Sequence, residues 1–203
     1  MNKLTNTAKK LDIFFRIMQI ASNIVWVGAL VGIGILLVGI LFRLDPEMIG
    51  TGYESLELGF VELTVADPYV PNKHMFLAQI GVVLILCAVF MWVSWKASKE
   101  VRRILAPMIQ GKPFQSIVGT GLKKLAGYSL WLGIIGNITI LAEQLFTVLI
   151  FDVPSLLLGE KIVHVNFNFE FDLTFLVLWA VLMLTSYVFR YGEQLQQLSD
   201  ETL

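Results

Sequence analysis

The sequence predicts an all-α polytopic membrane protein: four transmembrane helices, both termini in the cytoplasm and a small extracytoplasmic β-sheet cap formed by the two outer loops. The 203 residues are 56% hydrophobic and only 15% charged, whereas about a quarter of a soluble domain is charged. The apolar residues gather in four long segments, and Lys and Arg gather on one side of these segments. We therefore expect a single membrane domain over residues 1–203.

Four segments are long enough to cross a bilayer. A hydrocarbon core about 30 Å thick needs roughly 20 apolar residues in a helix. The expected spans lie at about 20–42, 75–95, 125–150 and 173–189. The first exceeds the apolar region of a signal peptide, about 7–15 residues, so we expect a retained anchor. None of the four shows the polar face that a soluble helical bundle needs.

The positions of Lys and Arg predict the orientation of the spans. Every Lys and Arg except Arg43, Lys73 and Lys161 lies in residues 1–19, 96–124 or 190–203. Short loops rich in Lys and Arg stay in the cytoplasm. We therefore expect the turn 96–124 and the tail 190–203 inside, together with the N-terminus. The loops 43–74 and 151–172, which are rich in acidic residues, are expected outside.

Both outer loops carry the period of two that is typical of half-buried strands. Apolar and polar residues alternate from Val163 to Phe171, and again on either side of Gly59, where a change of phase indicates a bulge or bend. Because an isolated hairpin is only marginally stable, we expect the loops to pair with each other. This cap either clamps the bundle or forms a sensor surface or ligand lid, lined by Tyr53, Tyr69, His74 and His164.

A few polar residues lie inside the predicted spans. Glu143 is the one carboxylate among them, about 9 Å from the middle of its span near Asn137. We expect an intramembrane polar cluster of Asn23, Asn137, Glu143 and Gln144, with Thr185 or Ser186 as further partners. One interpretation is a hydrogen-bonded group that fixes helix register, and the other is a proton or cation site. The sequence shows neither a second intramembrane acid nor an internal repeat.

The cytoplasmic segments predict a basic surface. After the second span a basic amphipathic helix is expected, which Pro107 kinks or ends, and Ser116 can begin the next helix. The candidate surface residues are Lys99, Arg102, Arg103, Lys112, Lys123, Lys124, Arg190, Tyr191 and Gly192. They contact either anionic lipid headgroups or a cytoplasmic protein, and the apolar residues of the tail, Leu195 and Leu198, can complete the protein site.

Several function classes find no support in the sequence. It contains no phosphate-binding loop, no nucleophile elbow and no paired histidines at helical spacing, so we expect no enzyme, no cofactor and no metal site. A net charge of -1 does not favour direct nucleic-acid binding.

Three segments resemble a bacterial family of small membrane proteins, domain-of-unknown-function family 2975. They are Arg103-Ile-Leu-Ala-Pro-Met-Ile-Gln-Gly-Lys-Pro-Phe114, Phe171-Asp-Leu-Thr174 and Phe189-Arg-Tyr-Gly-Glu-Gln-Leu-Gln196. The resemblance implies a multi-pass protein of the bacterial cytoplasmic (inner) membrane, often encoded beside a helix-turn-helix regulator of the Cro/repressor type. It brings no catalytic residues.

These observations favour a non-enzymatic regulator or sensor that docks a cytoplasmic partner such as a helix-turn-helix transcription factor. Two alternatives stay open at the level of sequence: a small transporter or transporter subunit that uses Glu143, and a protein that binds a lipid or hydrophobic ligand. The expected partners are the lipid bilayer, the regulator and a second copy of the chain.

Overall fold

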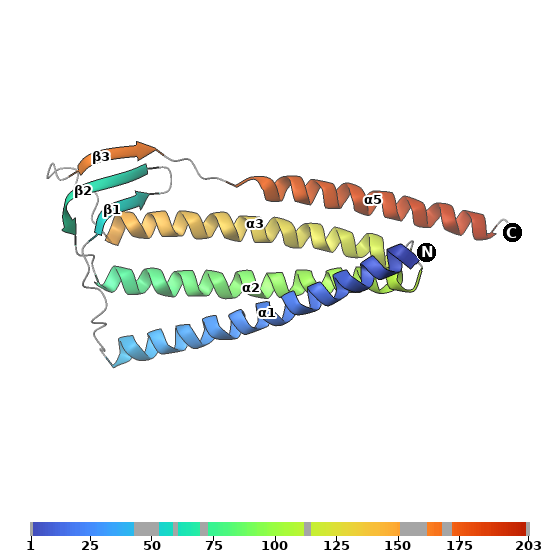
Figure 1. Ribbon diagram of the computed structural model, residues 1–203, viewed down its shortest axis with the longest axis horizontal. Helices are drawn as coiled ribbons and strands as arrows, with labels where there is room; N and C mark the ends of the chain where they lie inside the picture. The colour runs from blue at the N-terminus through green and yellow to red at the C-terminus, as the bar shows by residue number, and fades with distance from the viewer. Residues whose placement is uncertain are drawn as a thin grey trace. The chain divides into compact units, whose positions relative to one another are not determined.

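The computed structural model describes the backbone of residues 2–42, 53–58, 61–69, 73–111, 115–150, 162–167 and 172–201. It describes the side chains of residues 5–42, 74–111, 115–150, 172–199 and 201. Along the chain the elements are α1 (Asn2–Leu41), β1 (Tyr53–Leu58), β2 (Val61–Tyr69), α2 (Lys73–Ile109), α3 (Ser116–Ile150), β3 (Ile162–Phe167) and α5 (Thr174–Glu201) (Figure 1).

The four helices α1, α2, α3 and α5 are each long and apolar enough to cross a membrane, which confirms the prediction of four membrane-length segments. All are longer than the predicted spans that they cover, apart from one residue at the end of α1 and one at the start of α5. The 40 residues of α1 extend about 60 Å at 1.5 Å per residue, twice the thickness of a hydrocarbon core. The helices of this multi-pass membrane protein therefore continue beyond the apolar layer.

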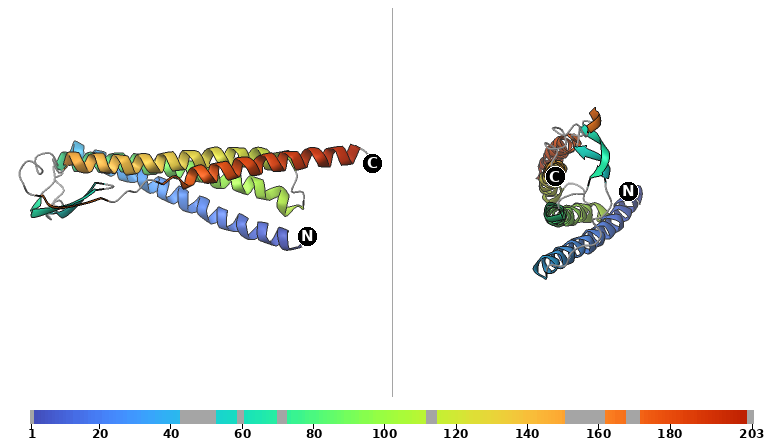
Figure 2. Two further views of the ribbon diagram at one scale, coloured as in Figure 1. Left: turned by 90° about the horizontal axis from the view of Figure 1, so that it is seen from above. Right: turned by 90° about the vertical axis from the view of Figure 1, so that its left-hand side faces the viewer.

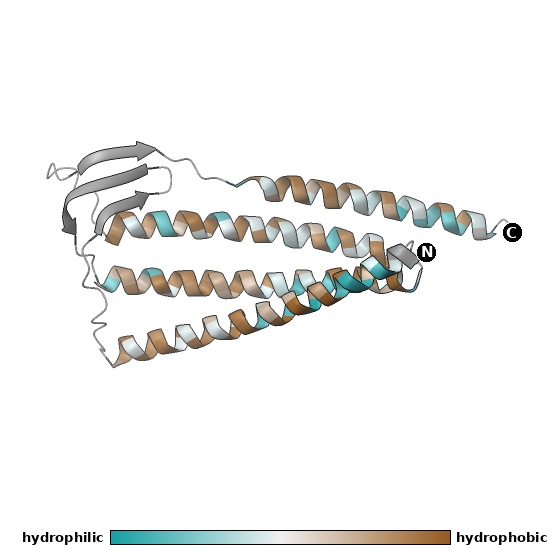
Figure 3. Cartoon of the chain, in the orientation of Figure 1, coloured by the Kyte–Doolittle hydropathy of each residue, from teal (hydrophilic) through white to brown (hydrophobic). Residues whose placement is uncertain are grey.

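Hydrophobic residues predominate along the long helices (Figure 3), and many of their side chains are exposed. On α1 the exposed fraction is 66% at Ile24 and 68% at Ile35, whereas the least exposed side chains are small or polar, such as Ala8, Ser22 and Ala29. Lipid tails solvate apolar side chains as well as a protein core does, and small residues allow helices to approach closely. This distribution is the one expected for helices that are surrounded by lipid.

By its internal contacts the chain, which the sequence analysis treats as one domain, divides into two compact units. Unit 1 comprises Met1–Trp26, Val89–Ile134 and Leu173–Leu203, and unit 2 comprises Val27–Ala88 and Ile135–Asp172. Because the two ends of a helix of 35 or more residues are too far apart to share neighbours, α1, α2 and α3 each contribute to both units.

Unit 2 contains a three-stranded antiparallel sheet in the order β1-β2-β3, so β2 lies in the middle (Figure 1). β1 and β2 come from the segment between α1 and α2, and β3 comes from the segment between α3 and α5. Leu58, the last residue of β1, pairs with Val61, the first residue of β2. The change of phase near Gly59 therefore falls between two strands, and the predicted bulge within a strand is not found there. The irregularities lie between Tyr53 and Ser55 and between Thr64 and Val65.

Two departures from the predicted elements concern strand and helix ends. β3 ends at Phe167, and residues 168–171 of the predicted strand lie outside the described residues. α2 runs through Pro107, which is buried, and ends at Ile109. Proline lacks the N–H that would donate to the carbonyl oxygen of Arg103, four residues earlier, but only two residues of α2 follow it, so little helix remains to be bent. Gly111, with φ of 77°, then supplies the left-handed residue that follows many helix ends.

Within unit 1, α5 lies alongside the first half of α3 (Figure 2). The Oγ of Ser186 donates a hydrogen bond to the carbonyl oxygen of Gly119 at 2.8 Å. A Cβ atom placed on Gly119 would lie 2.6 Å from Cγ of Arg190, and one placed on Gly133 would overlap Phe175. These contacts join the two helices, and those at Gly119 and Gly133 depend on the absence of a side chain from α3.

Candidate functional site

Basic side chains concentrate in unit 1. Every Lys and Arg whose side chain the structure describes belongs to this unit. They are Lys9, Lys10, Arg16, Lys96, Lys99, Arg102, Arg103, Lys123, Lys124 and Arg190. A membrane protein carries its excess of Lys and Arg on one side, so unit 1 holds the candidate surface.

Arg102 has an intramolecular role that the sequence analysis did not predict. Its Nε donates to Oδ1 of Asp12 at 2.9 Å, and its Nη1 donates to Oε1 of Gln19 at 3.1 Å. The Arg102 and Asp12 side chains are 34% and 30% exposed. Asp12 and Gln19 lie two turns apart on one face of α1, so a single guanidinium on α2 holds that face.

Some of the other predicted surface residues are exposed, and others contact a neighbouring helix or are half-buried. Lys123 and Lys124 are exposed near the start of α3, and Tyr191 of α5 is 63% exposed. Arg190 is exposed, while its methylene groups contact Gly119. Gly192 is half-buried, and Lys112 lies outside the described residues. The structure thus brings Arg190 beside the first turns of α3.

The hydrogen bond of Ser186 provides a first test of the α3–α5 contact. Because Ser186 is 2% exposed, we expect Ser186→Ala to lower the free energy of unfolding by about 0.5–1 kcal/mol. Titration with SDS in mixed micelles measures this quantity. The neighbouring Thr185→Ala is the control, because Thr185 donates to Val181 of its own helix. Equal effects of the two substitutions would contradict the assignment of Ser186 to the α3–α5 contact.

The predicted polar cluster does not form as one group. Asn137 is 9% exposed and its Nδ2 donates to the carbonyl oxygen of Asp172 at 3.0 Å. Glu143 is exposed and is therefore not enclosed in the polar cluster predicted for it. Six residues turn a helix by about 600°, which places Glu143 roughly 120° away from Asn137, whereas Gln144 shares the face of Asn137 and is half-buried.

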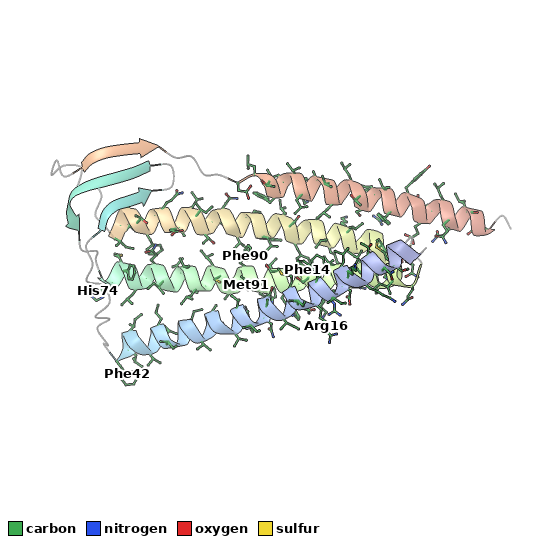
Figure 4. All side chains as sticks on the ribbon, viewed as in Figure 1. Phe14, Arg16, Phe42, His74, Phe90 and Met91 are labelled. Atoms are coloured by element: carbon green, nitrogen blue, oxygen red, sulfur yellow. The ribbon has the colours of Figure 1, made fainter. Side chains whose placement is uncertain are left out.

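The remaining members of that cluster belong to unit 1, whereas Asn137, Glu143 and Gln144 belong to unit 2. Thr185 and Ser186 donate to Val181 and Gly119, as described above. Asn23 is exposed and lines a cavity of about 200 Å³ with Trp26, Met91, Trp92 and Trp95. Figure 4 labels Met91 on α2. Asn23 therefore belongs to an aromatic-lined cavity.

A second and larger cavity in unit 1, of about 580 Å³, lies beside the first. It is lined by Trp95, Lys96, Lys99, Glu100, Arg103 and Tyr128. Its volume falls within the range of about 300–1,000 Å³ that is typical of small-molecule sites. Trp95 lines both cavities.

Contacts with aromatic rings position the two lysine side chains of this second cavity. Nζ of Lys96 lies 3.6 Å from the ring centroid of Trp92, and Nζ of Lys99 lies 5.4 Å from that of Trp95. Such contacts contribute about 0.5–1 kcal/mol at exposed sites. The guanidinium of Arg103 is 3.7 Å from the carboxylate of Glu100, a loose pair on the same helix.

The sequence predicted Lys99 and Arg103 as surface residues, but it did not predict that a third cation, Lys96, and the aromatic and acidic residues Trp92, Trp95, Tyr128 and Glu100 lie with them. The spacing of residues 92, 96, 99 and 103 is three or four, which puts them on one helix face. That spacing was a usable signal. The contribution of Tyr128 was not predictable, because it depends on how α3 packs on α2.

No protein-family model, curated protein or solved structure matches the chain. The resemblance to family 2975 stays a prediction.

Proposed function

We propose that this chain is a non-enzymatic regulator of the bacterial inner membrane that docks a cytoplasmic protein on the C-terminal part of α5. The observation that carries the proposal is that α5 continues as one helix to Glu201, past the predicted end of its span at Phe189. The extension measures about 18 Å. A helix that leaves the apolar layer by this distance can present its side chains to a soluble protein.

The proposal places the basic segments 1–19, 96–124 and 190–203 in the cytoplasm and the loops that supply the strands of the sheet outside. The support is the gathering of the described Lys and Arg side chains in unit 1. Short segments rich in these residues stay in the cytoplasm. In this arrangement the sheet, which joins strands from two different loops, receives the signal to which the docking surface responds.

The proposed docking surface consists of Tyr191, Leu195 and Leu198, with the charged residues Arg190 and Glu193 in the same part of α5. Tyr191, Leu195 and Leu198 are 63%, 49% and 59% exposed and stand at positions i, i+4 and i+7 of α5. This spacing is that of the apolar anchors of a helix that binds in a groove of its partner. The neighbouring charges would set orientation and association rate more than affinity.

The partner that we propose is a helix-turn-helix regulator encoded beside the gene, as the resemblance to family 2975 implies. Retention of such a regulator at the membrane would keep it from DNA, and a signal at the sheet would release it. The protein itself needs no contact with nucleic acid in this scheme.

Site-specific photo-crosslinking tests the docking surface. A photoreactive residue at Leu195 in the full chain is expected to give an adduct with the regulator in intact cells. A photoreactive residue at Val177, which is 65% exposed on the same helix but within the predicted span, serves as the matched control. Adding Tyr191→Asp is expected to reduce the Leu195 adduct about tenfold or more, since it puts a charge into an apolar contact.

Two results would contradict the docking surface. One is an equal yield of regulator adduct from Leu195 and Val177. The other is an adduct between Leu195 and lipid alone, which would mean that this part of α5 lies on the membrane surface.

A further inference from the structure

The larger cavity of unit 1 has an excess of positive charge. Lys96, Lys99 and Arg103 contribute three cations, and Glu100 contributes the one carboxylate among the lining residues. Within the part of the chain that the structure describes, neither lysine pairs with a carboxylate. The hydroxyl of Tyr128 adds a hydrogen-bond donor. This set of groups fits a ligand that carries a phosphate, whose oxygens accept charge-assisted hydrogen bonds.

The face of α2 that reaches the cavity changes from apolar to basic along the helix. Val89 and Trp92 are 43% and 46% exposed, and Lys99 and Arg103 on the same face are exposed as well. About 10 Å of helix separates Trp92 from Lys99. A soluble phosphate would make no contact with the apolar half of this face, whereas the acyl chain of a phospholipid can pack against it.

The predicted end of the second span places the cavity at the level expected for a membrane–water interface. The span predicted for α2 ends at Trp95, so the three cations lie within the next two or three turns. Trp92 and Trp131, which are 46% and 60% exposed, also belong to unit 1, and tryptophan is enriched at the headgroup level of membranes. Lysine stems commonly extend along apolar surface to place the ammonium at that level.

We propose that this cavity is a binding site for an anionic glycerophospholipid. The phosphate lies among Lys96, Lys99 and Arg103 with Tyr128 as a further donor, and one acyl chain follows Val89 and Trp92. Specificity for an anionic headgroup follows from the charge balance, because a zwitterionic headgroup would bring its own cation toward the lysines. The site is separate from the proposed protein-docking surface on α5.

Lipid titration of the full-length protein in detergent, monitored by native mass spectrometry, tests the proposal. The probes are phosphatidylglycerol and phosphatidylcholine with the same acyl chains. The wild-type protein is expected to bind its first phosphatidylglycerol at least tenfold more tightly than phosphatidylcholine. Each basic residue near an anionic lipid contributes a factor of about five. The double variant Lys96→Gln/Lys99→Gln is therefore expected to bind phosphatidylglycerol roughly 25-fold more weakly.

Two further variants separate this site from general surface attraction. Lys9→Gln/Lys10→Gln removes the same charge from exposed positions of α1 and is expected to leave the affinity unchanged. Glu100→Gln is expected to tighten phosphatidylglycerol binding about fivefold, because it removes the carboxylate of the cavity and frees Arg103. A structural defect would not tighten binding.

The outcomes are distinct. Equal losses in the two double-lysine variants would overturn the site, since they would show attraction to overall charge. Displacement of the lipid by excess glycerol phosphate or inorganic phosphate would also overturn it, in favour of a soluble phosphate ligand. Retention of phosphatidylglycerol against both competitors, together with tighter binding by Glu100→Gln, would support it.

Discussion

Replacing Gly133 with alanine is expected to destabilise the contact between α3 and α5 by about 2–3 kcal/mol. A Cβ at this position would overlap Cβ and the first ring atoms of Phe175. These atoms lie close to the backbone of α5, so the overlap cannot be relieved by rotating the far end of a flexible side chain. Overpacking of this kind usually costs about 1–3 kcal/mol, and Phe175 leaves little room for adjustment. Unfolding by SDS in mixed micelles measures the loss.

Gly127→Ala is the matched control for this prediction. Gly127 lies on the same helix, and a Cβ atom there would meet nothing within 4 Å. Alanine is a better helix former than glycine, so this variant is expected to be unchanged or more stable by up to about 1 kcal/mol. Adding Phe175→Ala to Gly133→Ala is expected to restore part of the stability. If Gly133→Ala and Gly127→Ala behaved alike, the proposed approach of Phe175 to Gly133 would be wrong.

Arg102→Met is expected to lower the free energy of unfolding by about 2 kcal/mol. Methionine keeps the aliphatic part of the side chain but leaves Asp12 without the guanidinium that contacts it at 2.9 Å. Removal of one partner from a fully buried pair costs about 3–5 kcal/mol. Because the two side chains are 34% and 30% exposed, solvent reduces this figure. The same SDS titration measures the effect.

A control and a rescue distinguish the ion pair from a general need for positive charge. Arg16→Met removes an exposed arginine from α1, labelled in Figure 4, and is expected to change stability by less than about 0.5 kcal/mol. Adding Asp12→Asn to Arg102→Met is expected to recover about half of the loss, because the unpaired carboxylate is removed. Additive effects of the two substitutions would rule out the coupling between Asp12 and Arg102.

Residues that act locally were predictable. The lengths of the four apolar segments follow from the order of residues along the chain, and the four helices cover them to within one residue. The alternation in the two loops predicted strands where β1, β2 and β3 lie, because a period of two is a property of each strand. The prediction for Pro107 was partly right: α2 ends close to it but continues for two more residues, because the disruption by a proline depends on how much helix follows it.

Residues that act across helices were not predictable. Glu143 and Asn137 looked like one cluster because they are near in sequence, yet the rotation of α3 separates them. In the sequence nothing distinguishes Arg102 from the other basic surface residues, whereas in the structure it donates hydrogen bonds to Asp12 and Gln19 of α1. The basic cavity needs Tyr128 of α3 beside Lys96, Lys99 and Arg103 of α2.

The sequence by itself therefore determined which segments are helical and apolar enough for a membrane and on which side of them the charge accumulates. These properties depend on single residues and their spacing, which lipid and water select directly. Only the tertiary structure decided which basic side chains contact other side chains of the protein and which line a cavity. That choice depends on how each helix is rotated against its neighbour, and in a lipid-solvated bundle small residues such as Gly119 and Gly133 set the rotation through contacts that hydrophobicity does not encode.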